Sequence, residues 1–379
     1  MNRKLRWLLI GLLFTGSLVL GGCSPRWSLT IETEGAAAEI IDFSTWTEYE
    51  RFAVEDQIPL EQILYGLGFR VIEQVEIQPP ESVGLVIPWG DSAAELWLTK
   101  QGDLRFGDQI LPVESIIVDV SSWEDQVEVG ITDLAATAAS ALNLSPPEIS
   151  TGSPLVKGQT DAVLMIFLDA FGYLRYSEAK QAGLIPTLSP IDPPRIGLTT
   201  YPPITTVSTA ARLTGTDPWN HGVETRGIRK TDQETILDRA AAAGLDVRAV
   251  EGDALSFQLR GADFDLSGDR DGSGGTDDNV LQNTLAVLEE GMPDLFLVHF
   301  HGIDDLGHEY GPLTEPEEKK IQEVDQAVGQ ILDRVPSGTL VLIFADHGMH
   351  AVEGQERLGN HGHLIERDML IPIWIERRN

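Results

Sequence analysis

The fold is decided by residues 294–312, which read DLFLVHFHGIDDLGHEYGP. An apolar run of strand length ends there at a group of histidines and aspartates. Similar apolar runs occur at AVLMIFL (162–168), DVRAVE (246–251) and TLVLIFA (339–345), with amphipathic helical stretches between them. Near-continuous apolar strands that alternate with such helices indicate a parallel sheet covered on both faces. We therefore expect an α/β fold with a mostly parallel sheet from residue 161 onward.

Acidic and imidazole side chains follow three of these four strands. In a parallel sheet, ligands bind beyond the carboxyl ends of the strands, so these side chains should gather at one edge. Taken singly, an aspartate after a strand is usually a turn former, but the repetition favours a metal site. Oxygen and nitrogen ligands suit Zn²⁺, with Mn²⁺ and Mg²⁺ less favoured as histidines increase, and their number suits two ions. The side chains are Asp169, His301, Asp304, Asp305, His308, Asp346 and His347, and a later loop adds His361 and His363.

A candidate nucleophile lies in YPPITTVSTAARLTGTDPWNHG (201–222). Thr205 and Thr206 stand where this segment turns helical, and a helix N-terminus favours an anion. A metal ion beside the hydroxyl would lower its pKa and make it a nucleophile at neutral pH. The alternative is that Thr205 only caps the helix.

The ordered motifs FLDAFG, PPITTV…LTGTDPWNHG, DDLGHEYGP, ADHGMH and GNHGH resemble those of the alkaline phosphatase superfamily. They are most similar to the type I phosphodiesterase and nucleotide pyrophosphatase branch, over residues 161 to about 375. The resemblance implies an alkaline-phosphatase-like α/β sandwich with two zinc ions that hydrolyses phosphate esters. The sulfatase branch is disfavoured, because the nucleophile region has no cysteine and no CxPxR-like pattern.

The resemblance also implies roles for single residues. Thr205 lies nine residues before the threonine of LTG, as the nucleophile does in that branch, and Thr206 is the second choice. Asp305 and His363 match no ligand position and are candidates for groups that orient ligands. One zinc would be held by Asp169, Asp346 and His347 and would touch Thr205, and the other would be held by Asp304, His308 and His361.

Arg226 departs from the branch, which carries an asparagine five residues after the histidine of NHG to bind a phosphoryl oxygen. A guanidinium could clamp two phosphoryl oxygens with its planar fork. That would suit a monoester or a more highly charged substrate. The alternative is a surface arginine in a shifted loop.

The chain begins with a basic segment and a 14-residue apolar run that ends at LGGC, where Cys23 is the only cysteine. The run is too short to span a bilayer comfortably and is typical of an export signal. It resembles the lipobox of bacterial lipoproteins, which implies a signal peptide over 1–23 and a lipidated Cys23. The protein would then be exported and anchored by lipid to a membrane of the cell envelope, outside the cytoplasm. The alternative is an N-terminal membrane anchor with an incidental cysteine.

Residues 24–150 are expected to form a small α+β accessory domain, followed by a Pro-, Ser- and Gly-rich linker and the catalytic domain at 161–379. Within the first of these, VGITDLAATAASALNLSPP (129–147) resembles a helix that follows the last metal histidine in many superfamily members. We expect this region to supply that helix from the N-terminal side. The formal net charge of −32 argues against a nucleic-acid partner.

The sequence thus predicts a metal-dependent phosphodiesterase or phosphatase that acts on a small molecule or a headgroup. One alternative is an envelope phosphotransferase that moves a phospho-headgroup. Another is a surface binding lipoprotein without catalytic activity.

Overall fold

The computed structural model describes residues 27–378, apart from 35–36, 81–82, 192, 253–255, 270–271, 273–274 and 355. The expected signal segment 1–23, with Cys23, lies outside the described residues. Lipidation, export and membrane attachment therefore stay predictions. Within the described ranges, no helix combines the length and apolar character needed to cross a membrane.

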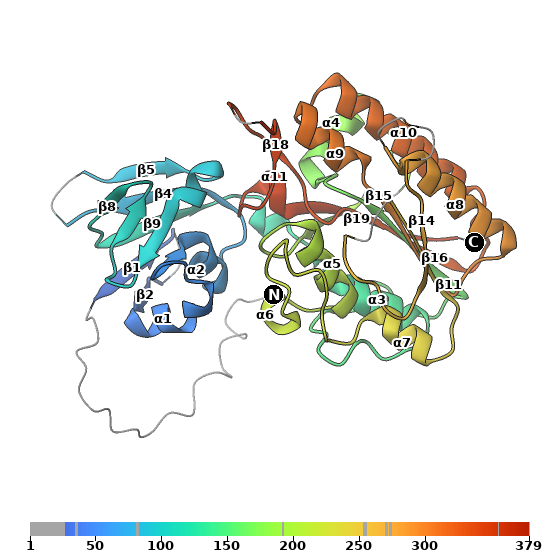
Figure 1. The fold of residues 1–379 in the computed structure, drawn as a ribbon, viewed down its shortest axis with the longest axis horizontal. Coiled ribbons are helices and arrows are strands. Elements are labelled where there is room, and N and C mark those ends of the chain that lie inside the picture. The colour runs from blue at the N-terminus through green and yellow to red at the C-terminus, as the bar shows by residue number, and fades with distance from the viewer. Residues whose placement is uncertain are drawn as a thin grey trace.

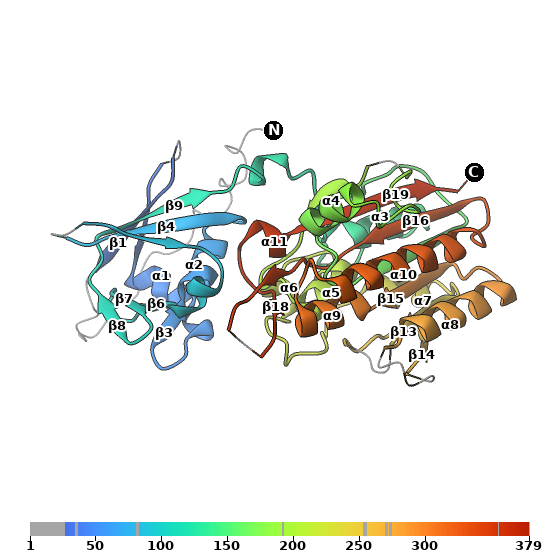
Figure 2. The ribbon, with the colours of Figure 1, turned by 90° about the horizontal axis from the view of Figure 1, so that it is seen from above.

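The chain folds into two lobes that lie side by side (Figures 1 and 2). The smaller lobe, called the N-terminal lobe below, holds a five-stranded sheet in the order β2-β1-β9-β4-β5 and a four-stranded sheet in the order β3-β6-β7-β8. Its strands are β1 (Ser28–Glu32), β2 (Glu39–Asp42), β3 (Gln57–Pro59), β4 (Ile72–Gln78), β5 (Leu85–Pro88), β6 (Leu96–Thr99), β7 (Leu104–Phe106), β8 (Gln109–Leu111) and β9 (Ser115–Val120). Its helices are α1 (Phe43–Glu48) and α2 (Leu60–Gly66), with short 3₁₀ helices at Glu50–Phe52, Asp91–Glu95 and Glu124–Gln126.

The large lobe is built on an eight-stranded sheet in the order β10-β12-β19-β16-β11-β15-β13-β14. All neighbours pair in parallel except β19, which runs antiparallel to β12 and β16. The strands are β10 (Val129–Gly130), β11 (Ala162–Leu168), β12 (Arg195–Leu198), β13 (Val247–Glu251), β14 (Asp263–Leu266), β15 (Leu295–Phe300), β16 (Thr339–Phe344) and β19 (Leu370–Arg377). A separate pair, β17 (His350–Ala351) and β18 (Gly359–Asn360), lies near the N-terminal lobe.

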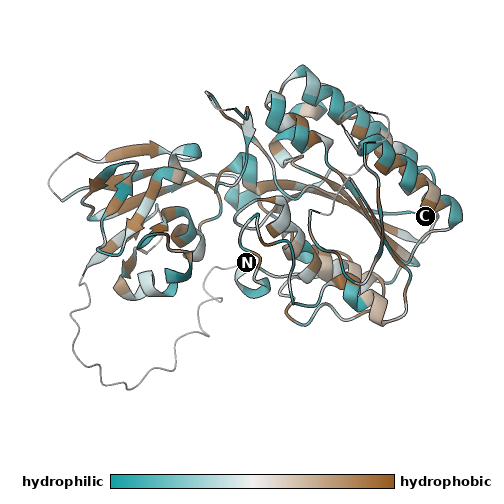
Figure 3. Ribbon diagram, in the orientation of Figure 1, coloured by the Kyte–Doolittle hydropathy of each residue, from teal (hydrophilic) through white to brown (hydrophobic). Residues whose placement is uncertain are grey.

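Helices cover both faces of this sheet (Figure 1). One layer contains α8 (Asp277–Glu290), α9 (Gly302–Tyr310) and α10 (Glu315–Leu332), and the other contains α3 (Asp133–Ala141), α5 (Thr205–Thr214) and α7 (Ile236–Ala242). The remaining helices are α4 (Tyr173–Gln181), α6 (Pro218–His221) and α11 (Glu366–Met369). Every residue of β11, β15 and β16 is buried, and Figure 3 shows these strands as apolar between helices with polar outer faces. The predicted fold class is confirmed.

Residues 129–141 pack in the core of the large lobe, although they precede the linker. Strand β10 pairs with β12, and α3 packs against α5 and α7. The helix that the sequence placed in this region is therefore present, and it buries its alanine-rich face in the sandwich. The division into domains at 24–150 and 161–379 stays a prediction.

Candidate active site

The sheet order places the predicted ligands at one edge. Strand β11 lies between β15 and β16 and runs parallel to both, so the carboxyl ends of the three strands are adjacent. Asp169 follows β11 directly, Asp346 follows β16 after one residue, and α9 begins just after β15. The structure thus brings residues from distant segments of the chain together at this edge.

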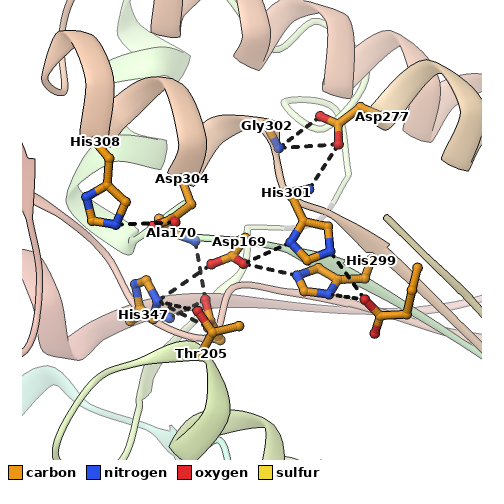
Figure 4. A network of polar contacts seen from close by, with 12 residues as sticks. Asp169, Ala170, Thr205, Asp277, His299, His301, Gly302, Asp304, His308 and His347 are labelled. Carbon is orange, nitrogen blue, oxygen red and sulfur yellow. Dashed lines mark hydrogen bonds and ion pairs between the residues drawn. The ribbon is translucent and has the colours of Figure 1, made fainter. Parts of the chain in front are cut away.

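Three buried side chains, Asp169, Asp346 and His347, form what we call the first cluster (Figure 4). The His347 Nε2 atom lies 3.3 Å from Asp346 Oδ2 and 3.6 Å from Asp169 Oδ1. The other oxygen of Asp346, Oδ1, accepts hydrogen bonds from the backbone N–H groups of Ala170 and His347. One oxygen of Asp346 is thus fixed by the backbone while the other faces the cluster.

The second cluster consists of Asp304, His308 and His361. Asp304 and His308 lie four residues apart on α9 and therefore share one face of the helix. The Asp304 carboxylate lies 3.4 Å from His308 Nε2 and 3.6 Å from His361 Nε2. The two clusters adjoin, because the rings of His347 and His361 stack with their centroids 3.8 Å apart. Two ions held by these groups would be neighbours.

The three imidazoles of these clusters are oriented alike. In each ring Nδ1 faces a backbone carbonyl oxygen, which only accepts, so Nδ1 carries the proton and Nε2 keeps its lone pair. Metal-binding histidines in proteins are typically fixed in this way. The acceptors for His347, His308 and His361 are the carbonyl oxygens of Gly348 (3.0 Å), Gly359 (2.8 Å) and Pro203 (2.8 Å).

Four buried atoms of the two clusters have no hydrogen-bond partner among the residues that the structure describes: Asp169 Oδ1, Asp346 Oδ2, Asp304 Oδ1 and His308 Nε2. Leaving a buried polar atom unpaired costs about 1–3 kcal/mol, so four at one place need an explanation. All four are Lewis bases, and each belongs to a group that could hold an ion. The residues present therefore fit divalent cations.

Two of the three carboxyl groups, those of Asp346 and Asp304, are hindered from ionising by burial and by the neighbouring charge of Asp169. Burial, followed by the charge of Asp169, raises the pKa of Asp346 to about 8. The same two causes raise the pKa of Asp304 above its ordinary value. A divalent cation would supply the missing positive charge and reverse this balance.

Thr205 lies beside the first cluster, at the start of α5 (Figure 4). Its Oγ1 is 3.4 Å from His347 Nε2. The capping residue of α5 is Ile204, so the alternative in which Thr205 serves only as the cap is wrong. Thr206 is buried and donates its hydroxyl to the carbonyl oxygen of Thr225 at 3.3 Å. Of the two threonines, only Thr205 contacts a cluster residue through its hydroxyl.

Arg226 reaches the second cluster from an exposed loop. Its Nη2 lies 3.3 Å from Nε2 of His361. The guanidinium therefore stands at the open side of the two clusters, where an anionic group could meet it. A contact between Arg226 and a phosphoryl oxygen stays a prediction.

Sequence reasoning missed His299, which holds Asp169 from behind, and it counted His301 among the candidate metal ligands. The His299 Nε2 atom lies 3.1 Å from Asp169 Oδ2, and its Nδ1 lies 2.8 Å from Glu251 Oε2. His301 also contacts Glu251, with its Nε2 at 3.2 Å (Figure 4). Burial acts to raise the pKa of Glu251, but the two imidazoles outweigh it and lower that pKa to about 2. The ring nitrogens of these two histidines face carboxylate oxygens, so we interpret both residues as groups that hold Asp169 in place.

A second overlooked group is Arg212 of α5, whose guanidinium is fully buried and lies 3.7 Å from the ring centroid of Phe167. Within the described part of the chain, its three nitrogens have no hydrogen-bond partner. Burial lowers the pKa of Arg212 to about 10, while Asp346, Glu251 and Asp169 act in the opposite direction. The side chain thus provides a fixed positive charge behind the carboxylates.

Asp305 and His363 lie outside both clusters. The Asp305 side chain is exposed, and burial together with Asp304 raises its pKa to about 6. His363 lies in a separate group with Asp91 and His350. Neither residue contacts the ligand atoms of the first or second cluster through an interaction that the structure shows among its described residues.

Residues 232–377 match the family model of type I phosphodiesterase / nucleotide pyrophosphatase, which is less than half of the chain. The resemblance to that family is confirmed. The match to this phosphodiesterase family includes both ligands of α9 and the three ligands after β16, and it begins after Asp169 and Thr205. It supports an enzyme that hydrolyses or transfers phosphate esters.

Curated relatives show the same similarity over short segments. The catalytic subunit of GPI ethanolamine phosphate transferase 3 of Mus musculus is 33% identical over 73 residues, which are 19% of this chain and 7% of the relative. GPI ethanolamine phosphate transferase 2 of Saccharomyces cerevisiae is 34% identical over 93 residues, which are 23% of this chain and 10% of the relative. The chain thus matches a tenth or less of the length of these relatives.

Among solved structures, the chain is similar to phosphonoacetate hydrolase from Sinorhizobium meliloti 1021 in complex with phosphonoformate. The TM-score is 0.41 at 18% sequence identity, and the alignment covers 50% of this chain and 57% of the other.

Proposed function

We propose that the protein is a two-metal hydrolase of phosphate esters that uses Thr205 as its nucleophile. The observation that carries this proposal is the convergence of two adjoining clusters on one hydroxyl, with Thr205 Oγ1 3.4 Å from His347 Nε2. That arrangement joins three requirements of phosphoryl transfer, namely positive charge, a nucleophile and a position for the leaving group.

The first and second clusters would each hold one ion, and Thr205 would complete the first. Three imidazoles and three carboxylates favour Zn²⁺ over Mn²⁺ or Mg²⁺. When bound, such ions neutralise the phosphoryl charge and lower the pKa of a neighbouring hydroxyl. The support for two ions comes from the four unpartnered buried atoms and the stacked histidines described above.

The chain's own residues would then carry out the chemistry. The Thr205 hydroxyl loses its proton to water, and its Oγ forms a bond to phosphorus in line with the ester oxygen. That oxygen leaves with the electron pair of the broken P–O bond and gains a proton from water. The peptide N–H groups at the start of α5 favour the anionic phosphoryl group. Water then hydrolyses the phosphothreonine, releasing the phosphoryl product and restoring the hydroxyl.

The same intermediate could instead pass its phosphoryl group to an alcohol. This second function is favoured by the relatives that are named ethanolamine phosphate transferases. A purified chain loaded with zinc should be assayed with a chromogenic phosphodiester and a monoester, each with and without an alcohol acceptor. If water receives the phosphoryl group and the main product is the free phosphoric acid derivative, the result supports the hydrolase. If the alcohol receives the phosphoryl group and the main product is its ester, the result supports the transferase. Absence of turnover with every substrate would favour the binding lipoprotein instead.

Replacement of Arg226 by alanine is expected to lower kcat/KM by about 10- to 100-fold, because a charge-assisted hydrogen bond to a phosphoryl oxygen is lost. The loss should be larger for a monoester than for a diester, since the monoester carries more charge. Arg229→Ala, an exposed arginine of the same loop, is the matched control and should behave like the wild type. Equal rates in Arg226→Ala and wild type would exclude a phosphoryl contact.

A further inference from the structure

Another group of potential ligands lies away from the candidate active site, at the junction of the two lobes, and we call it the junction cluster. It consists of Asp91 from the 3₁₀ helix Asp91–Glu95 of the N-terminal lobe, together with His350 of β17 and His363 of the large lobe. The Asp91 Oδ1 atom is 3.3 Å from His350 Nε2 and 3.6 Å from His363 Nε2. The histidines are buried and Asp91 is 39% exposed, so the cluster has one open side.

Each imidazole of the junction cluster is fixed from behind by a buried carboxylate. His350 Nδ1 lies 2.8 Å from Asp368 Oδ1, and His363 Nδ1 lies 3.0 Å from Glu61 Oε2. These two carboxylates are themselves anchored by backbone N–H groups. Asp368 Oδ2 accepts from Gly362 and His363, and Glu61 Oε1 accepts from Leu364. The carboxylates therefore act as fixed acceptors that turn both Nε2 atoms toward Asp91.

A carboxylate that holds Nδ1–H of a histidine while Nε2 faces outward is the usual support of a metal ligand. The junction cluster contains two such pairs, and both converge on one carboxylate oxygen. The alternative is a plain ion-pair cluster. In that case both Nε2–H groups would be directed at the same Asp91 Oδ1 atom, at 3.3 and 3.6 Å, which is longer than a usual charge-assisted hydrogen bond. A cation between the three groups would instead use both Nε2 lone pairs and the carboxylate oxygen together.

We propose that Asp91, His350 and His363 bind a third divalent cation, of the class of Zn²⁺ or another first-row metal. Two nitrogens and one carboxylate oxygen with one open position match a tetrahedral site that is completed by solvent. The ion would tie the N-terminal lobe to the two segments that carry ligands of the candidate active site. His350 follows His347 by three residues, and His363 follows His361 by two. Figure 2 shows β18 and α11, the elements on either side of His363, between the two lobes.

This inference is tested by counting ions rather than by activity. Wild-type protein equilibrated with zinc and freed of excess metal should retain three equivalents by plasma mass spectrometry, and Asp91→Asn should retain two. Asp108→Asn, a fully exposed aspartate of the same lobe, should retain three. The double variant Asp304→Asn/Asp346→Asn removes ligands from both active-site clusters, so one equivalent should remain. Adding Asp91→Asn to that double variant should remove this last ion. When the protein is loaded with cobalt instead of zinc, the same change should also remove the visible absorption of the bound Co²⁺.

The proposal fails if wild type and Asp91→Asn bind equal numbers of ions, or if the ion in the double variant survives Asp91→Asn. Should the double variant not fold, the comparison of wild type with Asp91→Asn still decides. The same ion count tests the junction site independently of the proposed two-metal active site. A single ion in wild type that is lost in Asp91→Asn would support the junction site and contradict the two-metal active site.

Discussion

Replacing Thr205 with alanine is expected to lower turnover of a phosphodiester at least about 10³-fold, because nucleophilic attack requires the hydroxyl that lies at the first cluster. Metal content should stay close to that of the wild type, because Asp169, Asp346 and His347 remain to hold the first ion. Thermal stability should also change little, since the Thr205 side chain does not cap α5. The measurement is kcat with a chromogenic substrate, paired with metal analysis of the same sample.

Two further variants test the specificity of this result. Thr205→Ser keeps a hydroxyl at the same place and should retain much of the activity, and mass spectrometry after a rapid acid quench should find phosphate on residue 205. Thr206→Ala removes a hydrogen bond to the carbonyl oxygen of Thr225, which costs about 0.5–1.5 kcal/mol of stability but spares the chemistry. Wild-type rates in Thr205→Ala, or loss of activity in Thr206→Ala alone, would overturn the assignment of the nucleophile.

The edge of the sheet where the clusters form can be predicted from the sequence, because each strand ends where a run of apolar residues stops. The apolar runs before Asp169 and Asp346 are continuous and buried, and parallel pairing of β11 with β16 brings their ends together. The i,i+4 spacing of Asp304 and His308 likewise predicts their shared helix face. These are local signals combined with one topological rule.

The residues that sequence reasoning missed have no such local signal. His299 lies inside a fully buried strand, and its two carboxylate partners come from two other strands. Asp91 and His350 are separated by 259 positions and meet only because the N-terminal lobe packs beside the large lobe. The roles of these residues depend on tertiary contacts that periodicity and spacing do not contain.

Removal of divalent metal by a chelator is expected to lower activity at least about 10²-fold, and added zinc should restore it. A simple loss could also arise from unfolding, so the informative variant is Asp346→Asn. In metal-free protein at pH 7, the Asp346 carboxyl carries a proton because its pKa is raised to about 8. An amide of the same shape then replaces a group that is neutral in the native protein but ionised in the unfolded chain, so the free energy of unfolding of the metal-free protein should rise.

In zinc-loaded protein the same substitution should be costly, because Asp346 Oδ2 is one of the buried atoms without a hydrogen-bond partner and would be lost as a ligand. A hundredfold loss of affinity at saturating zinc would remove about 2.7 kcal/mol of stabilisation. Denaturant unfolding of wild type and Asp346→Asn, each with zinc and with chelator, measures both differences. Asp294→Asn removes a carboxylate before β15, at the opposite end of the sheet. Its effect on the free energy of unfolding should be the same with zinc and with chelator. If Asp346→Asn destabilises the chelated and the loaded protein equally, Asp346 contributes to the fold without holding an ion.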